Sequence, residues 1–252
     1  METSNLNVHP QILDLYEALE QSGLHKEKEE VQSLVGYIEN MEYNLSVMMS
    51  EIQEMHSQID WLQNKGVRAK CVQIVKTAED KIGQAKTIVS IAKVKMIQSA
   101  GNAVKSFKEK GRSALVQSVE AMHIPAALSA MKNGFSRATE SMRQSAGRID
   151  SIRDELHEVG GHMKNVGRAL LGKPARQPQK LEADKGILAK LRGFFDSCGK
   201  TFSKMERGAD NLLGKMQRDK VPEKQSVKAE LRKLKSELSQ QSKTTLAKEQ
   251  AR

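Results

Sequence analysis

Apolar side chains recur along residues 31–62 in a strict seven-residue repeat, with steps of three and four residues in alternation. This repeat is typical of a helix that buries one stripe of side chains against a partner helix along its whole length. We predict a helix from about Lys26 to Lys65, with its last apolar position at Leu62. Its central apolar positions form a candidate interaction seam made of Leu34, Ile38, Met41, Leu45, Met48, Ile52, Met55 and Ile59. The pattern leaves open whether the seam pairs within one chain or between chains, and in which oligomeric state.

Three later stretches carry seams of the same kind. In residues 75–99, large side chains alternate with small ones, which lets two helices approach closely, as in an antiparallel pair. Another seam covers residues 188–216. The longest runs without a break through Leu128, Met131, Phe135, Ala138, Met142, Ser145, Ile149, Ile152, Leu156, Val159, Met163, Val166 and Leu170.

Prolines and glycines divide these seams. Pro10 is suited to the start of a short first helix and Gly23 to its end, while Gly66 is a candidate hinge and Pro125 a candidate break. Gly83, Gly101 and Gly111 fall inside the predicted helical segment that carries the seam of residues 75–99. We therefore expect an acidic helical segment 1–64, a basic helical segment 65–126, an amphipathic helix 127–173, a linker 174–185, C-terminal amphipathic helices 186–238 and a polar, disordered tail 239–252.

The fold class that follows is all-α, an elongated helical bundle or coiled coil of four or five long amphipathic helices. No stretch combines strand alternation with turn signals. No apolar run is long enough to span a bilayer, and the start of the chain lacks the features of a secretory signal. The two cysteines lie far apart in the sequence, so we expect reduced thiols and a cytoplasmic location.

Charge is distributed unevenly along the chain. Residues 1–64 hold 12 acids and 2 bases, a net of −10, whereas residues 65–126 hold 12 bases and 4 acids, a net of +8. Such asymmetry favours pairing of the two segments as an antiparallel hairpin, which would mask the basic residues and leave the intact protein a weak DNA binder. The candidate phosphate-contacting residues of this segment are Arg68, Lys70, Lys76, Lys81, Lys86, Lys93 and Lys95.

Two short motifs resemble catalytic signatures without matching them. The stretch HEVGGH places His157 and His162 five residues apart, whereas the zinc-protease motif needs a spacing of four to bring both onto one helix face. Gly199-Lys200-Thr201 lacks the earlier glycine and the preceding strand of a phosphate-binding loop. We therefore expect no enzyme, and we assign no catalytic, cofactor-binding or metal-binding residue.

The segments HPQILDLYEALEQSGLHKEKEEVQSLVGYIENME and LHEVGGHMKNVGRALLGK carry a resemblance to one group of bacterial proteins. They are similar to an uncharacterised helical family encoded on integrative and conjugative elements of Firmicutes. The resemblance covers about residues 9–60 and 150–173. It implies a cytoplasmic helical accessory protein of a mobile element, and it implies no catalytic residues.

These observations favour a non-enzymatic, helix-mediated interaction or scaffold protein that binds a helical partner or itself. The first alternative is a nucleic-acid-associated protein that uses the basic segment, although Phe107 is the only aromatic side chain available there for base stacking. The second is a peripheral membrane protein that uses the helix around Phe194, Phe195 and Phe202, which interleaves with lysines. The sequence identifies neither the partner nor the biological process.

Overall fold

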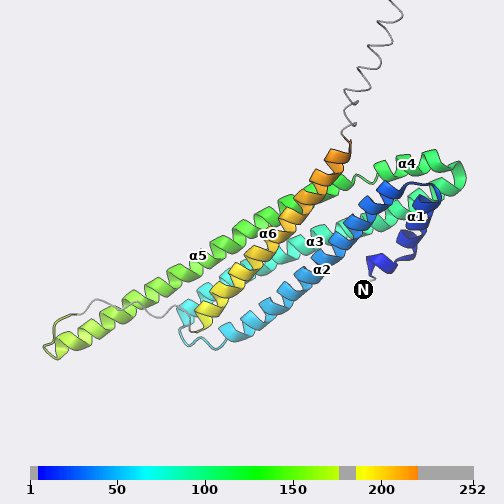
Figure 1. Ribbon diagram of the computed structural model, residues 1–252. Helices are drawn as coiled ribbons and strands as arrows, with labels where there is room; N and C mark the ends of the chain where they lie inside the picture. The colour runs from blue at the N-terminus through cyan, green and yellow to red at the C-terminus, as the bar shows by residue number, and fades with distance from the viewer. Residues whose placement is uncertain (1–4, 176–185, 221–252) are drawn as a thin grey trace, which may run out of the picture. The chain divides into compact units, whose positions relative to one another are not determined.

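The computed structural model describes residues 5–175 and 186–220, and over these ranges the regular structure is entirely helical (Figure 1). The elements are a 3₁₀-helix η1 (Leu6–Val8) and the α-helices α1 (Pro10–Gln21), α2 (His25–Ile59), α3 (Lys65–Lys110), α4 (Arg112–Glu120), α5 (Ile124–Leu170) and α6 (Ile187–Lys220). The predicted all-α bundle of long helices is confirmed.

The chain forms two compact units, divided between Leu213 and Gly214 within α6. The contacts described here all lie in the first unit. The part of the predicted C-terminal amphipathic helices beyond residue 220 and the polar tail 239–252 lie outside the described residues, as does most of the predicted linker.

The ends of the first helices follow from local chemistry. Pro10 opens α1, where its missing N–H costs nothing, and Gly23 follows the helix with a φ of +67°, as both residues predicted. The next predicted boundary was wrong, because α2 ends at Ile59 and Leu62 lies in the turn beyond it. Asn64 starts α3 by accepting hydrogen bonds from two backbone N–H groups, so Gly66 lies in the first turn of a helix and is not the hinge.

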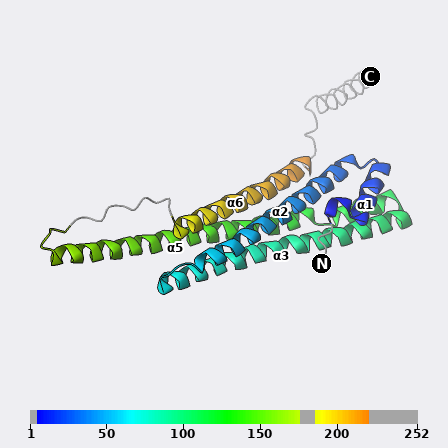
Figure 2. The same cartoon turned by 90° about the horizontal axis from the view of Figure 1, so that it is seen from below.

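Helices α2 and α3 form the predicted antiparallel hairpin (Figure 2). Near the turn, His56 Nε2 lies 3.2 Å from Glu79 Oε2. Farther from the turn, Lys93 Nζ lies 2.6 Å from Glu42 Oε2. The buried alternation of large and small residues in α3 lies along this hairpin, which agrees with the close packing that the sequence predicted.

Two interruptions separate α3 from α5. Gly111 has a φ of +77° and ends α3, which corrects the prediction of a helix-interior glycine. The nine-residue helix α4 follows, and the sequence pattern did not reveal it because it buries only Leu115 and Val119. Pro125 does not break a helix after Ile124. It stands in the first turn of α5, where no intrahelical donor is lost.

Helix α6 packs antiparallel to α5. Arg192 Nε donates to Asp150 Oδ2 at 2.8 Å near the start of α6, and the rings of Phe135 and Phe202 lie 6.2 Å apart farther along. The apolar positions of α6 from Leu191 to Ala209 are buried. Because α6 runs antiparallel to α5, the start of α6 is where α5 ceases to be covered by it. The candidate surface lies on α5 beyond that point.

Candidate interaction surface

The eight residues of the candidate interaction seam all lie in the core. Each is at most 8% exposed, and α2 packs against α3 and α1 of the same chain. In this structure the helices that cover the seam belong to its own chain. A surface for another molecule has to be sought elsewhere.

The candidate phosphate-contacting residues do not form one free basic face. Arg68 pairs with Asp60 at 2.6 Å and Lys70 with Glu155 at 2.7 Å. Lys93 pairs with Glu42 and is largely covered. Of the remaining four, Lys81 donates to a glutamine, and the exposed residues are Lys76, Lys86 and Lys95.

The aromatic residues of α6 are also covered. Phe194 is 7% exposed, and Phe195 and Phe202 are fully buried. The apolar side of α6 therefore already packs on the rest of the unit, and it is not open to a membrane surface as the membrane alternative required.

Within the part of the chain that the structure describes, the continuation of the longest seam is an uncovered apolar surface. That seam is buried from Leu128 to Ile152, whereas its last five apolar positions are exposed. We call these five the exposed stripe: Leu156, Val159, Met163, Val166 and Leu170. Their exposure is 37% at Leu156, between 57% and 72% at the three middle positions, and 83% at Leu170.

The exposed stripe begins where the neighbouring helices end. Lys70 pairs with Glu155, so α3, which starts five residues before Lys70, reaches to about the level of residue 160 of α5. Arg192 pairs with Asp150, so α6 starts at about the level of residue 155. Figures 1 and 2 both show the end of α5 continuing past α3 and α6.

The exposed stripe is compact on the helix surface. At 100° per residue its five positions fall within about 80° of the helix circumference, and over about 22 Å of length. Beside it lie Gly160 and Gly167, seven residues apart, and a methyl group built on either would meet no atom within 4 Å. Each glycine costs about 1 kcal/mol against alanine inside a helix. This edge of the helix therefore lacks side chains, although alanine at either position would make the helix more stable.

The charges around the exposed stripe are sorted by sign along the helix. Residues 154–158 contain three acids and no lysine or arginine. Residues 164–173 contain three bases and no acid. Residues 159–163, which lie between these two groups, contain no aspartate, glutamate, lysine or arginine. One end of the stripe is therefore acidic and the other basic.

The histidines of the HEVGGH motif lie on this segment. His157 is half-buried and His162 exposed, and the two are about 140° apart around the helix at 100° per residue. In the described part of the chain, no three side chains of the His, Cys, Asp and Glu types gather as a metal site would require.

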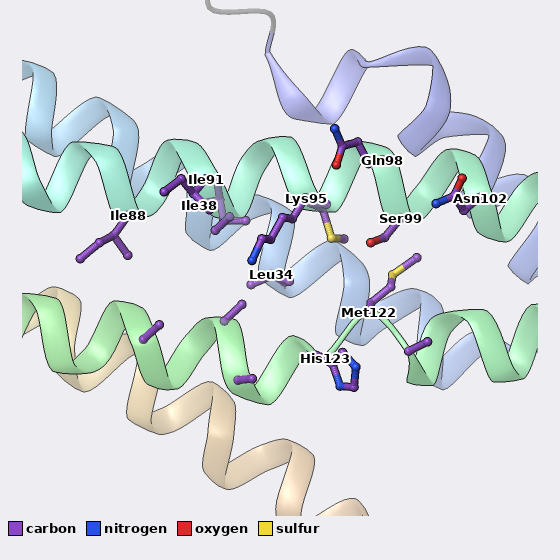
Figure 3. A pocket seen from close by; sticks show the side chains of 16 residues that line it. Leu34, Ile38, Ile88, Ile91, Lys95, Gln98, Ser99, Asn102, Met122 and His123 are labelled. Carbon is purple, nitrogen blue, oxygen red and sulfur yellow. The ribbon is translucent and has the colours of Figure 1, made fainter.

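A pocket of about 520 Å³ lies at the other end of the bundle, between α3 and the junction of α4 with α5. Its walls are mainly alanine, isoleucine and methionine side chains. In Figure 3 the Lys95 side chain points into the space between α3 and α5, whereas the His123 ring lies on the far side of the junction. Its polar lining residues include Lys95, Ser99 and His123, and we assign it no chemistry.

One structural residue was not evident from the heptad pattern. The Tyr37 hydroxyl donates to the backbone carbonyl of Met205 at 2.7 Å, and burial raises the pKa of this phenol. Its ring lies so close to Gly208 that a methyl group there would come within 2.9 Å of it. Tyr37 lies beside the seam of α2 and not in it, so the seam gave no signal that it ties α2 to α6.

No helix in the described ranges combines the length and the apolar character needed to cross a lipid bilayer. A sequence profile described as a family of unknown function (DUF6674) matches residues 8–252. No curated protein and no solved structure matches the chain.

Proposed function

The chain belongs to DUF6674, a family whose description gives no activity, and we propose from the structure alone that it is a non-enzymatic, helix-mediated interaction protein. The proposed docking surface is the exposed stripe on α5. The mechanism is burial of the five apolar side chains against a partner helix, with the charged ends of the segment selecting its direction.

The observation that carries this proposal is the change in exposure along one unbroken seam. Met142 and Met163 occupy equivalent positions three heptads apart, yet Met142 is fully buried and Met163 is 72% exposed. Apolar side chains at heptad spacing on the outside of a helix are the pattern that another helix covers. Contiguous exposed apolar surface of this kind marks interaction sites in soluble proteins.

The two alternatives have less support. A helix that lies on an anionic membrane needs a basic polar face and interfacial aromatic residues. Residues 154–173 contain three acids, three bases and no aromatic residue. For nucleic acid, three of the seven candidate basic residues are engaged by carboxylates of the same chain.

The biological setting is a further part of the proposal. The resemblance of residues 9–60 and 150–173 to proteins of integrative and conjugative elements supports a cytoplasmic accessory role in such an element. The second of these segments contains the exposed stripe. Genes for conjugation or excision beside the coding sequence would support this setting, and a neighbourhood of ordinary chromosomal genes in all members would count against it.

Site-specific photo-crosslinking in the cells that express the chain tests the interaction directly. A photoreactive amino acid is placed in turn at Val159, Met163 and Val166, and at the control positions Glu158 and Lys164, which are exposed but lie off the stripe. We expect protein adducts at the three stripe positions and none at the two controls, because only the stripe faces a docked helix.

Two results would contradict the proposal. One is the absence of any protein adduct at the stripe positions. The other is equal adduct formation at stripe and control positions, which would mean random collision. The two alternatives are tested by measuring how much of the chain is retained on anionic vesicles and on DNA at two salt concentrations. We expect substitution of Met163 to change neither.

A further inference from the structure

We propose that the partner helix is the same segment of a second copy of this chain, docked antiparallel across a two-fold axis. This proposal rests on the proposed function, because it names the occupant of the exposed stripe. It commits to one alignment, in which Met163 lies opposite Val166 of the second copy and Val159 opposite its Leu170. The axis then passes between Met163 and Val166.

The alignment follows from continuity with the buried part of the seam. Along that part, α5 packs antiparallel to both α3 and α6, as the pairs Lys70–Glu155 and Arg192–Asp150 show. A second α5 would extend the same mode of packing over the part that these helices leave bare. A two-fold axis makes the stripe its own complement, so that one apolar surface serves both molecules.

The alignment also fits the ends of the bundle. With Val159 opposite Leu170, the tip of one α5 reaches the level of residue 159 in the other. This is about where α3 begins to cover α5, so each tip stops against the end of the other bundle without overlapping it. A shift by one more heptad would bring the tip to Ile152, which α3 and α6 already bury.

Charge selects the antiparallel direction. A parallel pair would place the three acids of residues 154–158 beside the same three acids, and the bases of residues 164–173 beside the same bases. An antiparallel pair brings the acidic end of each helix toward the basic end of the other. Opposite charges flanking an apolar seam favour the pairing, and like charges oppose it.

The glycines fit the same arrangement. Gly160 and Gly167 lie along one edge of the stripe with open space around them. In this alignment that edge meets the same edge of the second copy, and Gly160 lies within about 3 Å in level of its Gly167, so small residues face each other there. Small residues at the margin of a helix pair allow the backbones to approach closely.

The C-terminal part of this chain is the other apolar occupant to consider. Asp210 pairs with Lys132, and Leu156 lies 24 residues farther along α5, or about 36 Å at 1.5 Å per residue. A second copy brings a matching helix directly to the stripe, without spanning that distance.

Sedimentation equilibrium of the full-length chain tests the stoichiometry. We expect a dimer that dissociates on dilution, as a short helix pair at the low end of interface sizes should. Met163→Glu should raise the dissociation constant roughly 30-fold or more, the effect of losing an interface hot spot. The matched control is Val94→Glu, which adds the same charge at a half-exposed valine of α3 and should leave the dimer unchanged.

Crosslinking with a short bis-maleimide tests the direction. Val159→Cys and Leu170→Cys chains, carrying different tags, are treated separately and then as a mixture. The antiparallel alignment predicts a crosslink between the two variants and none within either, because equivalent positions lie about 16 Å apart along the helix. The natural thiols Cys71 and Cys198 are buried and provide the background.

The outcomes separate this inference from the proposed function. A chain that stays monomeric at its highest soluble concentration would overturn the second-copy proposal, as would homotypic crosslinks of both cysteine variants, which indicate a parallel pair. If the stripe positions nevertheless form periodic photo-adducts with a different protein in cells, the proposed function stands with another partner. A monomer without any adduct would overturn both.

Discussion

The two halves of α5 have the same sequence pattern and different surroundings. From Leu128 to Ile152 the seam is buried by α3 and α6, and from Leu156 to Leu170 it is exposed. The heptad repeat itself does not change at the boundary. The repeat therefore reports that a helix face needs a partner, and only the lengths and directions of the other helices decide whether that partner belongs to the same chain.

The largest expected effect comes from placing the same charge in each half. Met142→Glu should lower the free energy of unfolding by about 3–5 kcal/mol, the cost of an unpaired charge in a core. Met163→Glu should change the unfolding of the protomer by no more than about 0.5 kcal/mol, as exposed substitutions do. Urea denaturation at low protein concentration measures both. Equal losses would show that the stripe is part of the protomer core.

Sequence reasoning located most of the fold but not this boundary. The 3.5-residue spacing was enough to predict the four long helices, and the opposite charges of residues 1–64 and 65–126 were enough to predict the hairpin. The seam at residues 156–170 looked identical to its buried half because its exposure depends on where α3 and α6 begin. Asn64 sets the start of α3, and α6 begins at Ile187; both positions are far away in sequence.

Single helix ends and single contacts were the harder features to predict. Seven-residue periodicity extends through Leu62 although α2 stops at Ile59, because a turn residue can satisfy the pattern by chance. The eight seam residues of α2 are buried, and α2 packs against helices of its own chain. The exposed stripe could not be distinguished from the buried part of its seam, because both have the same heptad pattern. That pattern does not say where the neighbouring helices end.

Thiol chemistry sharpens the comparison between a buried and an exposed seam. Burial, helped by the charge of Glu51, raises the pKa of Cys198 to about 12, and burial also raises the pKa of Cys71. At pH 8 almost none of the Cys198 thiol is ionised, and the Cys71 thiol is less ionised than an exposed one. Because both are also buried, both should resist a disulfide reagent until the protein unfolds. A Met163→Cys thiol should react faster by at least about two orders of magnitude.

The reaction rates of the buried and exposed thiols can be compared by labelling between pH 7 and about pH 9, the range around the ordinary thiol pKa. The rate for Met163→Cys should rise with pH as the exposed thiol ionises. The unsubstituted chain should show no native-state reaction, with two thiols released in denaturant. Rapid native-state labelling of Cys198 would mean that α6 separates readily from α5, and the buried half of the seam would then be only transiently covered.

A smaller effect should follow from loosening α6 on the bundle. Tyr37→Phe removes the hydroxyl that donates to the Met205 carbonyl while keeping the ring against Gly208. We expect a loss of about 1 kcal/mol in unfolding free energy, the usual net value of one such hydrogen bond. Tyr43→Phe is the control, because that ring is 69% exposed on the same helix and should have no effect.

The smallest expected effect on stability comes from adding a single methyl group, by glycine-to-alanine substitution, in each half of α5. Gly167→Ala should stabilise the protomer by up to about 1 kcal/mol, because the helix gains and no atom stands in the way. Gly134→Ala brings the same gain, but its new methyl group would lie 2.7 Å from Cδ1 of Ile88. Moving that side chain costs about 0.5–1.5 kcal/mol, so the net change should be close to zero.

Both glycine substitutions are best measured in the Met163→Glu chain, where pairing through the stripe cannot contribute to the unfolding free energy. With Met163 restored, Gly167→Ala should have the opposite consequence for association, because the added methyl group thickens the edge that a second helix approaches. A protomer that gains stability while its dimer weakens would assign Gly167 to the interface. A protomer destabilised by Gly167→Ala would instead show that this edge of α5 is covered by its own chain, which would contradict an open stripe.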